Sequence, residues 1–249
     1  MNTIFRKATV ILSLGIVLLS GSCANFSREG TSRPGQSKQD NAVPPPLSEA
    51  EKNLLQKLGG ELLPDGNISI EGITIHRSER EISFTGLINM TSGKLDVLIA
   101  LPNGRLHESL IVSKIDPLKL QIALLLIGAR NGRRNAGDEK IPQGTLFNID
   151  IQPENGKRMP VEDILIEDNT AKKMDRLGWV FVGSSFGSNM YCLAKEEGNV
   201  VTIYSSGNTI LDNPGSSGNG AWGLSIITEN CPKYNSPVTV FLSFRNPGK

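Results

Sequence analysis

The chain has 249 residues, with 26 basic and 25 acidic side chains, two histidines and three cysteines. This length suits one domain of moderate size with additional tails. The net charge of +1 argues against a general nucleic-acid binder, which needs a concentrated basic surface. Two histidines leave little room for a histidine-rich metal site, and the sequence predicts no cofactor.

Residues 1–22 have the pattern of an export signal. Arg6 and Lys7 give a short basic start, and residues 8–19 form an apolar core of 12 residues. A core of this length is too short for a transmembrane helix, which needs about 20 residues, and its flanks match a secretory signal. The sequence therefore predicts that residues 1–22 are a signal peptide and that the mature chain lies outside the cytoplasm.

The small residues 20–22 run directly into Cys23. This junction resembles the lipobox of bacterial lipoproteins, in which the cysteine becomes the lipidated first residue of the mature protein. The match departs from the usual pattern because Leu19 stands one place too early. Ordinary cleavage after Ala24 is the alternative, and both interpretations place the chain outside the cytoplasm. The lipobox interpretation implies a membrane-anchored lipoprotein that faces the periplasm.

Residues 23–46 have the composition of a disordered tether. They are rich in Ser, Gly, Gln, Asn and Pro, lack apolar periodicity and end in three prolines. Such a segment cannot bury enough apolar surface to offset the entropy that it would lose on ordering. We expect it to connect the lipid anchor to a single folded domain, residues 47–249.

If Cys23 carries lipid, two cysteines remain, Cys192 and Cys231. In an oxidising envelope compartment, two remaining thiols suggest one disulfide. The alternative is two separate buried thiols, and the sequence leaves both open. The chain contains no CxxC pair, which argues against iron–sulfur and thioredoxin chemistry.

The folded part begins with a predicted short helix, because Ser48 and Glu51 have the spacing of a capping box. A short apolar stripe follows and ends at two glycines. From residue 68 the apolar residues recur with a period of two, which predicts antiparallel strands joined by polar turns. The first strands are expected at residues 68–70, 73–75, 82–84 and 95–101.

Asn103 and Gly104 form a strong hairpin signal, so residues 106–112 are expected to return as the next strand. Asp116 and Pro117 then predict the start of a helix, whose apolar residues 118–127 are typical of a buried helix packed on a sheet. Frequent short strands with few helices predict an α+β domain: a mainly antiparallel β-sheet with one buried central helix and one short N-terminal helix. Further strands are predicted at residues 146–151, 161–166, 179–182, 190–194, 200–204, 224–227 and 238–244.

Residues 183–187 match the G-x-S-x-G pattern of a nucleophile elbow. In that fold the catalytic histidine follows the serine in the chain, whereas here no histidine follows Ser185. We therefore assign no catalytic residue. The glycine-rich residues 207–223 carry Trp222, which suits either a recognition residue of a glycan-binding module or a core anchor for the loop.

His107 and Glu108 stand at the start of a predicted strand. Neighbouring strand residues point to opposite faces, so we expect the two side chains not to act as adjacent ligands. His107 suits either an acid, base or ligand, or a hydrogen-bonded structural residue. No spacing singles out a metal site.

Seven segments carry a family resemblance: residues 101–110, 116–117, 122–128, 178–183, 198–201, 210–214 and 237–240. Together they resemble the YdjY-type envelope domain, over a stretch from about Gly72 to Asn246. The resemblance implies an exported domain of unknown function. It also makes His107, Glu108, Ser109, Asp212 and Asn213 the positions to test for a ligand site.

The leading hypothesis is an exported, lipid-anchored envelope protein with a non-catalytic binding or structural role. The alternative is an envelope enzyme or metal-dependent protein with a site around His107 and Glu108. The expected partners are the membrane, through the N-terminal lipid anchor, and an unknown envelope ligand or protein, but not nucleic acid.

Overall fold

The structure, a computed structural model, describes residues 46–132, 144–203, 208–213 and 223–245. All of these residues belong to one compact unit, Pro44–Lys249. The predicted signal peptide, Cys23, nearly all of the predicted tether and Trp222 lie outside the described residues.

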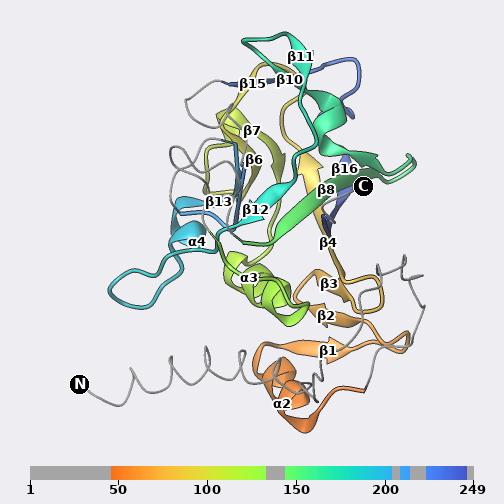
Figure 1. Ribbon diagram of the computed structural model, residues 1–249, viewed down its shortest axis with the longest axis vertical. Coiled ribbons are helices and arrows are strands. Elements are labelled where there is room, and N and C mark those ends of the chain that lie inside the picture. Colours follow the sequence, from red (N-terminus) through yellow and green to blue (C-terminus); the bar gives the residue numbers. More distant parts are fainter. Residues whose placement is uncertain (1–45, 133–143, 204–207, 214–222, 246–249) are drawn as a thin grey trace, which may run out of the picture. The chain divides into compact units, whose positions relative to one another are not determined.

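Eight strands close into a β-barrel, because the last strand of the series pairs back with the first (Figure 1). Alternate residues of the longest strands, such as Ile149, Ile151, Val240 and Leu242, are fully buried. Side chains fill the interior of a barrel of this size. In order around the barrel, the strands are β4 (Glu81–Ile88), β16 (Pro237–Phe244), β8 (Leu146–Pro153), β12 (Trp179–Phe181), β14 (Leu211–Asp212), β13 (Asn199–Thr202), β6 (Val97–Ala100) and β7 (Ser109–Val112).

Further strands extend the barrel wall or form a second sheet. Three strands continue outward from β4: β3 (Ile73–His76), β2 (Ile68–Ile70) and β1 (Gly60–Leu62). A short strand, β9 (Met159–Pro160), pairs with β8. The second sheet has the order β11 (Lys172–Lys173), β10 (Leu165–Glu167), β15 (Leu224–Ile226) and β5 (Lys94–Leu95).

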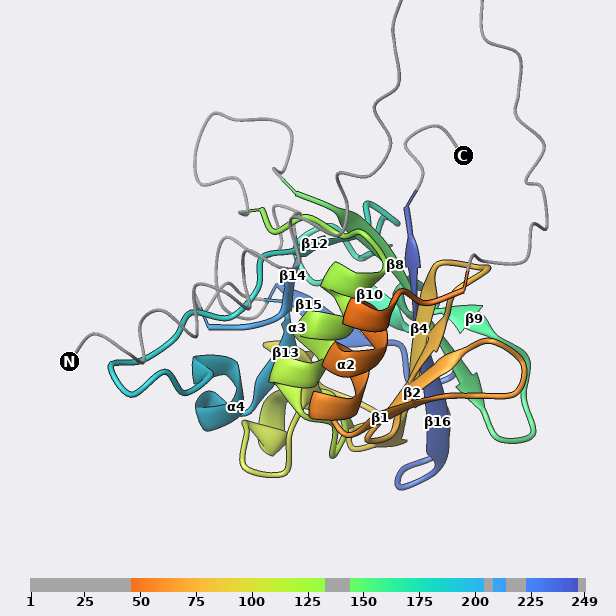
Figure 2. The same cartoon turned by 90° about the horizontal axis from the view of Figure 1, so that it is seen from below.

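The helices are short, and two of them begin as the sequence predicts. Ser48 and Glu51 form the capping box of α2, and Asp116 accepts a hydrogen bond from the backbone of Leu118 at the start of α3. Helix α3 lies across one end of the barrel, beside α2 in the view from below (Figure 2). The helices are α2 (Glu49–Lys57), α3 (Pro117–Leu126) and α4 (Leu193–Glu197), with the 3-10 helices η1 (Leu106–Glu108) and η2 (Val161–Ile164).

The predicted fold class is wrong, because the domain is mostly β and its main feature is a closed barrel. The alternating apolar pattern predicts individual strands, but closure depends on the pairing of β4 with β7, which no local pattern encodes. The predicted buried central helix corresponds to α3, which does not lie at the centre of a sheet. Only half of its ten residues are buried, since it covers an end of the barrel.

The predicted hairpin around Asn103 and Gly104 is also wrong. Strands β6 and β7 pair in parallel, with Val97 opposite Ser109. The chain turns at Gly104, passes through η1 and returns to the end where β6 began. Gly104 is required because a Cβ atom there would lie 2.5 Å from the carbonyl oxygen of Gly198. The strand expected at residues 190–194 is absent, since α4 begins within it.

The two ends of the barrel differ in what covers them. At one end β4 and β8 begin, and α3 lies across it; we call this the helix end. At the other end β6 and β7 begin while β13 and β14 finish, next to the strand β5 of the second sheet. We call it the polar end because three buried polar side chains, Asp96, Asp212 and Asn213, gather there with the nearly buried Glu108.

Candidate functional site

The polar end brings together the two segments that the family resemblance selects. Ser109, Val97, Thr202 and Asp212 lie in register across the adjacent strands β7, β6, β13 and β14. Three strand spacings separate Ser109 from Asp212, which corresponds to about 14 Å along the wall. The two segments therefore reach the same end of the barrel, but they are not direct neighbours.

His107 and Glu108 contact each other, contrary to the sequence-based expectation. His107 Nε2 lies 3.3 Å from Glu108 Oε1. They do not alternate across a strand, because both belong to the 3-10 helix η1. The side chain of His107 is 77% exposed, whereas that of Glu108 is 12% exposed. The pair therefore presents an accessible imidazole beside a nearly buried carboxylate.

Two residues that the sequence did not single out complete this cluster. Arg105 Nη1 lies 3.8 Å from Asp96 Oδ2 and 4.0 Å from Glu108 Oε2, so one guanidinium bridges two carboxylates. Backbone hydrogen bonds fix the arrangement, because Asp96 N donates to Glu108 O and Ile203 N donates to Asp96 O. Asp96 interrupts an apolar run between Leu95 and Val97, and this is the one feature of the sequence that could have identified it as a site residue.

Ser109, Asp212 and Asn213 are buried and serve the barrel wall. Ser109 Oγ donates to Arg105 O, and Asp212 Oδ1 accepts a hydrogen bond of 3.1 Å from Thr202 Oγ1. Asp212 is 1% exposed and Asn213 is fully buried. The hydrogen bonds of Ser109 and Asp212 stabilise the strand ends near the cluster, and none of the three side chains faces solvent with His107.

A fourth acid, Glu162 in η2, is buried against Trp179. Glu162 Oε1 accepts a hydrogen bond of 3.0 Å from Trp179 Nε1, and Glu162 Oε2 lies 3.9 Å from Arg176 Nε. Burial raises the pKa of the Glu162 carboxyl above its usual value, and the hydrogen bond and the nearby guanidinium offset only part of that effect.

The two cysteines are free thiols. Cys192 is buried at the start of α4, while Cys231 is half-buried and its Sγ lies 3.7 Å from Met90 O. Burial raises the pKa of the Cys231 thiol to about 11, which keeps it protonated and unreactive. The structure does not support the predicted disulfide.

The described residues contain no group of three or more His, Cys, Asp or Glu side chains that would hold a metal ion. The two histidines do not meet, because His76 ends β3 on the wall and is bonded to Ser83 Oγ at 2.8 Å. Within the described part of the chain, no helix has both the length and the apolar character to span a bilayer.

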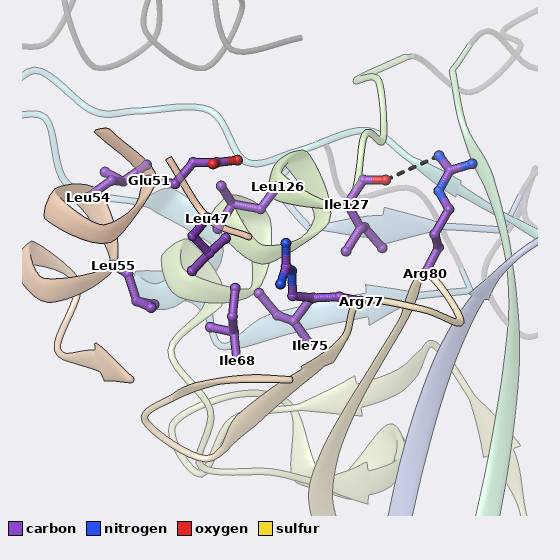
Figure 3. A pocket seen from close by; sticks show the side chains of 10 residues that line it. All are labelled: Leu47, Glu51, Leu54, Leu55, Ile68, Ile75, Arg77, Arg80, Leu126 and Ile127. Atoms are coloured by element: carbon purple, nitrogen blue, oxygen red, sulfur yellow. Dashed lines mark hydrogen bonds between the residues drawn. The ribbon is translucent and has the colours of Figure 1, made fainter. Parts of the chain in front are cut away.

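A pocket of about 240 Å³ opens at the helix end (Figure 3). Its walls come from the approach to α2, from α2 itself, from β2 and β3, and from the end of α3, and seven of its ten lining side chains are leucine or isoleucine. The other three are Glu51, Arg77 and Arg80. Sequence patterns alone do not predict this site beyond an expected polar turn, because its walls come from segments far apart in the chain.

Comparison with known families gives one match. The model of the YdjY domain family matches residues 73–243. The match includes β3, the complete barrel, α3, the second sheet and the cluster around His107, and it excludes α2, β1 and β2. No curated protein and no solved structure matches the chain.

Proposed function

The chain belongs to the YdjY domain family, and from this premise we propose that it is an exported, lipid-anchored envelope protein with a non-catalytic binding role. The observation that carries the anchor is Cys23, placed directly after an apolar core of 12 residues and three small residues. The binding role is supported by the apolar pocket at the helix end. Leu47 lines that pocket, and it is the first residue after the predicted tether.

Metabolic labelling with palmitate tests the anchor. The full chain should incorporate label and pellet with membranes, and Cys23→Ala should abolish the label. Cys192→Ala is the matched control, because it removes a thiol from the folded domain and should leave labelling unchanged. Equal labelling of the wild type and Cys23→Ala, or no labelling of either, would overturn the anchor.

A catalytic or metal-dependent role at His107 and Glu108 is the second candidate. The contact of 3.3 Å between the exposed imidazole and a nearly buried carboxylate favours it. Titration of the full chain with Zn²⁺ tests it, since His107→Ala should weaken binding while His76→Gln should not. Identical Zn²⁺ binding by the wild type and His107→Ala would exclude a metal site there.

A further inference from the structure

The pocket at the helix end is larger than a packing defect. Protein interiors contain few voids larger than one water molecule, which occupies about 30 Å³ of the liquid. The volume of about 240 Å³ exceeds that several-fold. It is nevertheless smaller than the roughly 300–1,000 Å³ of sites that enclose drug-sized ligands. Its size therefore suits a short chain or the end of a longer one.

The walls favour an apolar ligand. Leu54 and Leu55 come from α2, Ile68 and Ile75 from the extended sheet, and Leu126 from α3. These side chains surround the space from three directions (Figure 3). Contact with them removes apolar surface from water on both partners, which is the main driving force for binding a hydrocarbon chain.

The charged residues favour an anionic head group. The carboxylate of Glu51 is already bound, because it accepts hydrogen bonds of 2.7 Å from the backbone nitrogen and the hydroxyl of Ser48. Arg80 is held at the edge, where it donates to Ile127 O at 3.2 Å and lies over the ring of Phe244. A guanidinium has five N–H donors, so Arg80 retains donors for an anion.

Arg77 supplies the second positive charge. Its guanidinium stands between the wall formed by Leu47 and the wall formed by Ile75 (Figure 3). Arg77 and Arg80 flank one turn between β3 and β4, so both guanidinium groups line the same side of the pocket. Arginine recognises carboxylate and phosphate groups better than other side chains do.

We infer that this pocket binds a single-chain amphiphile with an anionic head group, its chain between α2 and α3 and its head at Arg77 and Arg80. Helix α2 contributes one buried side chain, Leu55, so most of its surface is not fixed by packing in the core. This inference rests on the proposed binding role and is independent of the lipid anchor.

Photo-crosslinking tests the inference on the full chain in membranes, with diazirine-labelled decanoic acid as the probe and peptide mass spectrometry as the readout. We expect crosslinks in α2, β3 and the end of α3. Leu54→Trp should block them by filling the pocket. Arg77→Gln should weaken them about tenfold, because one charge-assisted hydrogen bond is lost, while labelling by diazirine-labelled decanol should stay unchanged. The matched control Arg130→Gln removes an exposed arginine of the same end outside the pocket.

Crosslinks that survive Leu54→Trp, or labelling by decanoate that is unaffected by Arg77→Gln, would overturn the inference. Near-ultraviolet circular dichroism of each variant shows whether the fold is retained. A parallel probe, lysophosphatidylglycerol with a diazirine in its single acyl chain, separates a free fatty acid from a membrane-derived lipid as the source of the amphiphile. Palmitate labelling of the same samples tests the lipid anchor separately. Loss of the crosslinks with palmitate labelling retained would overturn the pocket's ligand and leave the anchor standing.

Discussion

The two ends of the barrel are built on opposite chemical principles. The helix end is covered by α3, whose Leu120, Ala123 and Leu124 are fully buried, and it leaves an apolar pocket beside α2. The polar end gathers carboxylates of low exposure: Asp96 and Glu108 share Arg105, and Asp212 is bonded to Thr202. Burial of apolar surface stabilises the helix end and tolerates changes in side-chain shape. Hydrogen bonds stabilise the polar end, and they require specific partners.

This contrast indicates where each kind of function belongs. An apolar pocket next to a lightly attached helix suits binding of a flexible chain, since the walls can adjust. A fixed cluster with one exposed imidazole suits chemistry that needs a defined geometry. The family match includes the polar end completely but stops short of α2 and β2, which form part of the pocket. The pocket therefore lies partly outside the residues that the family model matches.

The largest expected effect is the loss of packing at the helix end. Leu124→Ala should lower the free energy of unfolding by about 2–5 kcal/mol, because it removes a fully buried side chain and leaves a cavity. Urea denaturation measures this effect. The control Leu62→Ala concerns a leucine that is 49% exposed and should change stability by less than about 0.5 kcal/mol. Equal losses in the two variants would contradict the role of α3 as the cover of the barrel.

The next effect concerns the polar end. Asp212→Ala should lower the free energy of unfolding by about 1–3 kcal/mol, because it leaves the buried Thr202 hydroxyl without its acceptor. Asp212→Asn retains an acceptor oxygen and should lose less. The exposed Asp175 provides the matched control Asp175→Ala. If Asp212→Ala were as stable as the control, the polar end would not depend on its hydrogen bonds.

The sequence predicted local structure well where one segment determines it. The capping box of Ser48 and Glu51, the helix start at Asp116 and the alternation in β16 are all confirmed. Each depends on residues a few positions apart, whose interactions form within one turn or one strand. The spacing of these residues is therefore enough to predict each of these local elements.

Barrel closure and the candidate site were not predictable in the same way. A parallel pair such as β6 and β7 usually has a long crossover, so Asn103 and Gly104 indicated a hairpin that does not form. The same error placed His107 and Glu108 on a strand, although they lie in η1 and contact each other. Arg105 became part of the cluster only through this turn. Long-range pairing decides all three points, and local patterns do not encode it.

A smaller effect is the dependence of stability on pH through Glu162. Because burial raises the pKa of Glu162, the folded chain holds its proton to higher pH than the unfolded chain, in which the pKa is near 4.5. The free energy of unfolding should therefore fall as pH rises through the interval from 4.5 to the raised value. Glu162→Gln removes this contribution while keeping an acceptor for Trp179.

Chemical denaturation at several pH values between about 4 and 7 measures that slope. The variant should show a weaker decline of stability with pH than the wild type. The exposed Glu154 gives the control Glu154→Gln, which should follow the wild type. The same slope in the wild type and in Glu162→Gln would show that this carboxyl ionises as easily in the folded chain as in the unfolded chain.

The smallest effect on stability is expected at His107, the residue at the centre of the second candidate function. His107 is 77% exposed, and its contact with Glu108 is open to solvent on the imidazole side. Such exposed pairs contribute little to folding, so His107→Ala should change the free energy of unfolding by less than about 0.5 kcal/mol. A loss of 2 kcal/mol or more, on the order of that for Asp212→Ala, would make His107 a structural part of the polar end. If His107→Ala is stable but no longer binds Zn²⁺, the fold does not require the imidazole beside Glu108. The polar end would then be the site of a metal-dependent function.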